Sequence, residues 1–128
     1  MRDDTNFLGL FGKETATRTL EPGQLLFAKG DPAHEMYIVK RGQLQILNDD
    51  FVLETVGPGD LIGEMALVDE SPRSASVKAL TDCEVIPVNE SRVLWMVEQT
   101  PRFALRLLKV LSTRLRRTNE LVKGLQQP

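Results

Sequence analysis

The feature that most constrains the fold is a series of short apolar segments, between residues 15 and 88, that glycine and proline turns separate. Within the segment Gln43–Leu47, the apolar residues Leu44 and Ile46 alternate with the polar residues Gln43 and Gln45, which is the period of a strand with one buried face. Such strands at roughly even spacing, without a long helix between them, predict an antiparallel β-barrel or jelly roll. The predicted strands are Thr15–Leu20, Gln24–Ala28, Met36–Lys40, Gln43–Leu47, Phe51–Val56, Ala75–Ala79 and Cys83–Val88.

From residue 89 onward the apolar spacing becomes helical. Asn89 or Ser91 is suited to cap a first helix, and Pro101 is suited to the first position of a second helix that runs to about Lys123. Trp95 is expected to pack between the first helix and the barrel.

The chain of 128 residues is expected to form a single domain that is mainly β. It comprises a short N-terminal helical segment within residues 1–13, a barrel over about 15–89 and helices over about 90–125.

The composition limits the classes of function and the kinds of site that we expect in this chain. The lone cysteine, Cys83, excludes an internal disulfide, and its apolar surroundings favour a small buried residue. No apolar run reaches membrane-spanning length and no signal peptide is recognisable, so we expect a cytoplasmic protein without a membrane partner. His34, the only histidine, lies in a polar turn without a second ligand. Because neither a metal cluster nor an acid–base pair is evident, we expect neither a metal site nor an enzyme.

The stretch from Gly63 to Val77 combines residues that suit an anionic ligand with hydroxyl groups. Gly63 permits a close backbone approach, Glu64 offers a carboxylate to hydroxyl donors, and Arg73 offers paired donors that match phosphate oxygens. A short helix over Glu64–Leu67 would direct free amides at the anion. The alternative is that Glu64 and Arg73 form a structural ion pair.

The two phrases Gly63-Glu64-Met65-Ala66-Leu67 and Pro72-Arg73-Ser74-Ala75-Ser76-Val77 resemble the phosphate-binding cassette of the cyclic nucleotide-binding domain family. The resemblance implies that Glu64 holds the ribose 2′-hydroxyl and that Arg73 holds the cyclic phosphate. It extends to the turn glycines and covers the chain from about Leu10 onward. The implied ligand-binding residues are Gly63, Glu64, Met65, Ala66, Arg73, Ser74, Ala75, Thr118 and Asn119.

The last predicted helix carries a heptad stripe in which Thr118 interrupts a line of apolar residues. This spacing suits a two-stranded seam, which would make the chain a homodimer, and it equally suits packing against the chain's own barrel. In the transcription-activator branch of the family, hydroxyl residues at the place of Thr118 and Asn119 contact the purine base. The apolar members of the stripe are Leu108, Leu111, Leu115, Val122 and Leu125.

Charge is distributed unevenly along the chain. Residues 102–123 hold seven basic residues against one acidic residue, a net +6, within a chain of net −2. Because Phe103 is the only aromatic residue among these charges and no second helix follows, we favour a solvated helix that complements its own acidic domain over a DNA-binding surface, and we expect no specific DNA binding.

The resemblance implies a receptor whose ligand is cyclic AMP or, less favoured, cyclic GMP. In family members that select cyclic GMP, the residue after the cassette arginine is often a threonine whose hydroxyl meets guanine. Ser74 also carries a hydroxyl, so its identity does not decide between the two nucleotides. Thr118 and Asn119 suit adenine. The receptor would signal through its C-terminal helices to a dimer partner or an effector protein. The alternatives are a truncated relative of a Crp-type transcription regulator and a ligand-free interaction module of the same fold.

Overall fold

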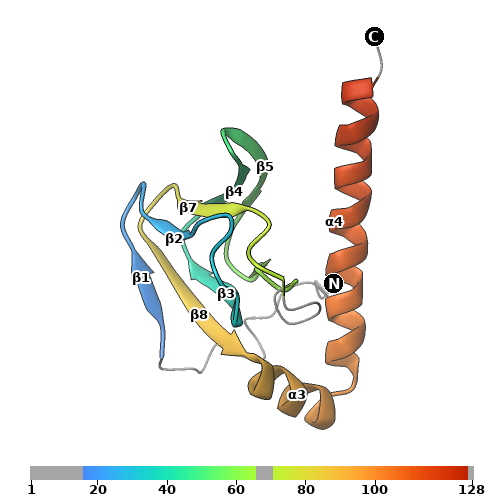
Figure 1. Ribbon diagram of the computed structural model, residues 1–128. Coiled ribbons are helices and arrows are strands. Elements are labelled where there is room, and N and C mark those ends of the chain that lie inside the picture. The colour runs from blue at the N-terminus through green and yellow to red at the C-terminus, as the bar shows by residue number, and fades with distance from the viewer. Residues whose placement is uncertain (1–15, 66–70, 127–128) are drawn as a thin grey trace.

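In the computed structural model, the described residues are 16–65 and 71–126. They form two antiparallel four-stranded sheets with strand orders β1-β8-β3-β6 and β2-β7-β4-β5 (Figure 1). The predicted fold class is therefore confirmed. The strands are β1 (Arg18–Leu20), β2 (Leu25–Phe27), β3 (Glu35–Arg41), β4 (Leu44–Asn48), β5 (Phe51–Val56), β6 (Leu61–Ile62), β7 (Ser76–Ala79) and β8 (Cys83–Asn89).

The predicted strand positions are correct to within a few residues, with one omission. Strand β6 has only two residues, and it pairs with Tyr37 and Ile38 of β3. A pair of apolar residues carries no detectable period, so a strand could not be predicted there. The predicted N-terminal helix lies outside the described residues, as do Ala66 and Leu67 of the predicted cassette helix.

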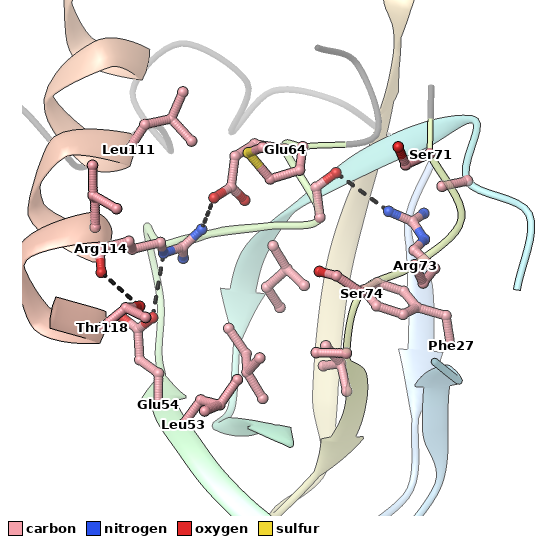
Figure 2. Close-up of a pocket in the computed structure, with 18 of the residues that line it drawn as sticks. Phe27, Leu53, Glu54, Glu64, Ser71, Arg73, Ser74, Leu111, Arg114 and Thr118 are labelled. Atoms are coloured by element: carbon pink, nitrogen blue, oxygen red, sulfur yellow. Dashed lines mark hydrogen bonds and ion pairs between the residues drawn. The ribbon is translucent and has the colours of Figure 1, made fainter. Parts of the chain in front are cut away.

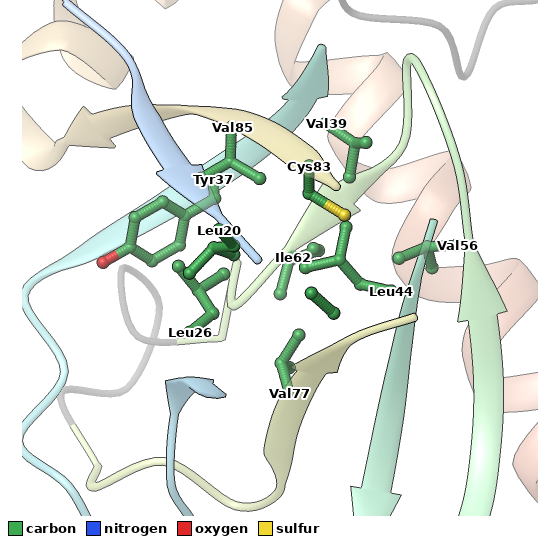
Figure 3. Close-up of a cluster of buried hydrophobic side chains, with 11 residues drawn as sticks. Leu20, Leu26, Tyr37, Val39, Leu44, Val56, Ile62, Val77, Cys83 and Val85 are labelled. Atoms are coloured by element: carbon green, nitrogen blue, oxygen red, sulfur yellow. The ribbon is translucent and has the colours of Figure 1, made fainter. Parts of the chain in front are cut away.

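Two apolar clusters hold the described residues together. The first lies between the sheets and includes Val39, Leu44 and Val77 (Figure 3). Cys83 belongs to it and is fully buried, as predicted, with its thiol donating to the Gln43 carbonyl at 3.2 Å. The second cluster joins the sheet to the helices, and the ring of Phe103 is fully buried within it.

Helix α3 (Glu90–Gln99) begins after Asn89, whose side chain accepts a hydrogen bond from the Arg92 amide at 2.9 Å. The prediction that Trp95 is buried was wrong, because this side chain is 51% exposed. Helical spacing directs the neighbouring Met96 toward the second cluster instead, and Trp95 contacts the guanidinium of Arg92.

Helix α4 (Arg102–Gln126) stands along one side of the sandwich (Figure 1). Its first half docks through Phe103 and Val110, whereas four of the five apolar stripe residues, Leu108, Leu115, Val122 and Leu125, are exposed. Most of the apolar surface of the heptad stripe is therefore exposed among the described residues. None of the described helices is long and apolar enough to cross a membrane.

Candidate functional site

A cavity of about 550 Å³ lies between the sandwich and α4. Its size falls within the usual range for small-molecule sites. Figure 2 shows that its walls come from the strands, the cassette and α4. The predicted site residues that line it are Gly63, Glu64, Met65, Arg73, Ser74, Ala75 and Thr118. Asn119 is not among the lining residues, and Ala66 lies outside the described residues.

The backbone of Arg73 is fixed by the turn that follows β2. The Gly30 amide donates to the Arg73 carbonyl at 2.8 Å, and the Arg73 amide donates to the Asp31 carbonyl at 2.9 Å. The Asp31 carboxylate in turn accepts from the Ala28 amide at 2.9 Å. The position of the cassette arginine is therefore set by a turn more than forty residues earlier in the chain.

The side chain of Arg73 is only 7% exposed. It donates to the Gly63 carbonyl at 3.2 Å and to the Glu35 carbonyl at 2.7 Å, while its Nε is buried without a hydrogen-bond partner. Burial lowers the pKa of this guanidinium below its ordinary value. Since an arginine stays protonated in proteins, the cavity contains a buried cation held mainly by neutral groups.

Gly63 is required at its position for two reasons. Its φ of +75° lies in the left-handed region, which side chains disfavour. A Cβ built there would also collide with the guanidinium of Arg73. The glycine thus gives the arginine room to reach the carbonyl to which it donates.

Glu64 is also 7% exposed, and its carboxylate pairs with Arg114 of α4 rather than with Arg73. The Oε1 atom accepts from Arg114, which also donates to the Leu61 carbonyl. A carboxylate has about four acceptor positions, so one arginine does not exhaust its capacity for a ligand hydroxyl. The alternative of a structural ion pair between Glu64 and Arg73 is therefore not what the fold forms.

A chain of alternating charges continues along this wall. In Glu54 of β5, Oε2 lies 3.3 Å from Nε of Arg114, and Oε1 lies 2.8 Å from Nη1 of Arg117. Burial alone would lower the pKa of Arg114, but the carboxylates of Glu64 and Glu54 outweigh it, and the pKa is raised. These two arginines pair with acidic groups of their own barrel, in agreement with the favoured interpretation of the basic helix.

Arg114 and Glu54 are cavity residues that sequence analysis did not select. A signal for Arg114 was present, because it precedes Thr118 by four residues and so shares its helix face. The hydroxyl of Thr118 donates to the Arg114 carbonyl at 3.0 Å. Nothing in the sequence singles out Glu54, since its selection depends on how β5 meets α4.

This combination of groups can hold a small ligand that has an anion at one end and hydroxyl groups beside it. The sandwich and its cavity thus define a small-molecule-binding domain. The chain belongs to the cyclic nucleotide-binding domain family, whose model matches residues 17–100.

Similar proteins include transcription regulators. A CRP-like cAMP-activated global transcriptional regulator of Mycobacterium tuberculosis is 30% identical over 113 residues, which cover 80% of this chain and 50% of the relative. A cyclic AMP receptor protein of Thermus thermophilus is 34% identical over 105 residues, which cover 77% and 49%. The crystal structure of the Thermus thermophilus catabolite activator protein superposes with a TM-score of 0.75 at 30% identity, covering 86% of this chain and 54% of that one. The matched region therefore spans about half the length of each of these two relatives.

Proposed function

We propose that this chain is a cytoplasmic receptor domain that binds a cyclic nucleotide, with cyclic AMP preferred to cyclic GMP, and that it is not an enzyme. The observation that carries the proposal is the presence of Arg73 and Glu64, both almost fully buried, in the lining of one cavity. Buried charges are costly unless they meet partners, so a buried cation held by neutral groups suits an anionic ligand.

In the proposed complex, Arg73 holds the cyclic phosphate, with Ser74 and the Ala75 amide beside it. Glu64 accepts a hydrogen bond from a ribose hydroxyl. Thr118 lies on the wall that α4 contributes and is suited to meet the base. The two curated relatives described above are both named for cyclic AMP, which supports the choice of cyclic AMP over cyclic GMP.

Thermal unfolding with and without excess nucleotide tests the proposal. A ligand at one hundred times its dissociation constant stabilises the folded state by about 2.7 kcal/mol. We expect this increase with cyclic AMP, and we expect Arg73→Ala to remove it. If neither cyclic AMP nor cyclic GMP raises the melting temperature at millimolar concentration, the chain is a ligand-free interaction module.

We further propose that the signal leaves through α4. Arg114 joins this helix to Glu64, and beyond it the apolar side chains of α4 are exposed. A ribose hydroxyl at Glu64 therefore acts on a carboxylate that also anchors the helix. Amide hydrogen exchange should change over residues 115–126 when nucleotide binds, and unchanged exchange there would contradict this route.

The receiving partner in this proposal is a second copy of the chain, joined along α4, or an effector protein. We expect no specific DNA binding by these 128 residues. The regulators among the relatives are about twice as long as the matched region, and their activity on DNA is not carried over to this chain.

A further inference from the structure

The ring of Phe27 lies against the guanidinium of Arg73. The ring centroid is 4.0 Å from Cζ of the arginine, and the side chain also lines the cavity. Tyr37 is farther away, at 5.8 Å, and its ring stacks on that of Phe27 with centroids 6.2 Å apart. The cation therefore rests on the face of one aromatic residue, which a second aromatic residue supports (Figure 2 labels Phe27 beside Arg73).

Among the described residues, the direct contacts of this guanidinium are with neutral groups, while the carboxylates of Glu35 and Asp31 act on it without forming an ion pair. Its hydrogen-bond acceptors are the backbone carbonyls of Gly63 and Glu35, and its third contact is the Phe27 ring. Among the ion pairs of the described residues, none includes Arg73. A carboxylate partner would hold the side chain but would compete with an incoming anion, whereas an aromatic face attracts the cation without neutralising it.

We propose that Phe27 is a positioning residue for anion recognition, whose ring fixes the orientation of the Arg73 guanidinium toward the cavity. An arginine side chain has large rotamer entropy, and part of the binding energy is lost if the ligand itself must order it. The ring orders the side chain before the ligand arrives. This inference rests on the proposed function, because the anion in question is the phosphate of the nucleotide.

Titration calorimetry with cyclic AMP and with adenosine, which lacks the phosphate, tests the role of the ring. Phe27→Leu should weaken cyclic AMP about tenfold, since a desolvated cation–π contact contributes on this scale, and should leave adenosine unchanged. Phe27→Tyr, which keeps a ring, should restore most of the affinity. In an Arg73→Ala background, Phe27→Leu should have no further effect on cyclic AMP.

Equal losses for cyclic AMP and adenosine would overturn the proposal. So would an unchanged effect of Phe27→Leu when Arg73 is absent, because the ring would then act on the cavity as a whole. Val39→Ala is the control for a purely structural change. Val39 is fully buried in the first apolar cluster, against which Phe27 packs, and it does not line the cavity. It should lower stability without separating the two ligands.

A second measurement needs no nucleotide. Relaxation of the Arg73 Nε–Hε group by NMR should report an ordered side chain in the wild type and in Tyr37→Phe, and a disordered one in Phe27→Leu. An equally ordered Arg73 in Phe27→Leu would refute the positioning role even if the wild type bound neither nucleotide. Absence of nucleotide binding by the wild type would count against the proposed function alone.

Discussion

Replacing Arg114 by methionine tests the energetics of the α4 contact most directly. The substitution keeps an unbranched side chain but removes the cation that Glu64 binds. The Arg114 side chain is 18% exposed and Glu64 is almost fully buried, so water compensates the carboxylate poorly. Removing one partner of a buried ion pair typically costs about 3–5 kcal/mol, because the remaining charge stays buried.

We expect a value near the lower end of that range, about 3 kcal/mol, for Arg114→Met. The reason is that Glu54, the second carboxylate beside Arg114, keeps its contact with Arg117 in the variant. The matched control is Arg117→Met, in which a 64% exposed side chain loses one ion pair. That change should cost less than about 1 kcal/mol.

Urea unfolding of the ligand-free protein measures both variants, with the midpoint lowered and the slope unchanged if only stability is affected. Adding Glu64→Gln to Arg114→Met should recover part of the loss, since a neutral amide is less costly to bury than a carboxylate. A loss below about 1 kcal/mol for Arg114→Met, or no recovery in the double variant, would refute the account of a buried, mutually dependent pair.

Further outcomes are expected from simple variants. Gly63→Ala should abolish cyclic AMP binding and lower stability by about 1–3 kcal/mol in urea unfolding, because it combines strained φ with a collision at Arg73. Sedimentation should show a dimer that Leu115→Glu dissociates, since Leu115 is 62% exposed on α4; a wild-type monomer at high concentration, with and without nucleotide, would contradict the seam. If cyclic GMP binds more tightly than cyclic AMP, Ser74→Ala should weaken cyclic GMP selectively in calorimetry, whereas equal weakening of both nucleotides would show that Ser74 acts on the phosphate and not on the base. A mobility-shift assay should detect no sequence-dependent DNA binding at physiological salt.

The strand order of the sandwich depends on distant pairings, yet the strands themselves were predictable. Turn residues such as Pro22 and Gly23 act locally, and the alternation in Gln43–Leu47 needs only one buried face. Strand β6 was missed because two residues have no period. The burial of Trp95 was predicted from residue type alone, and the face of α3 that meets the sheet decided otherwise.

Some residues of the site were likewise predictable from a short stretch of sequence, whereas others depend on contacts between distant parts of the chain. Gly63, Glu64 and Arg73 were identifiable because the chemistry of an anion site requires those residue types within a short stretch. Arg114 is one of seven basic residues in one segment; its spacing from Thr118 places it on the same helix face, but only the contact between α4 and the barrel shows that it pairs with Glu64. Thr118 and Asn119 show most clearly where prediction of the site from sequence fails. They are adjacent in sequence, yet successive residues of a helix point in directions about 100° apart, so one lines the cavity and the other does not. If Asn119 also contacts a base, it must contact one bound outside the cavity of its own chain. In the proposed dimer, that base is bound by the second copy, so the sedimentation test of the dimer also tests this part of the site.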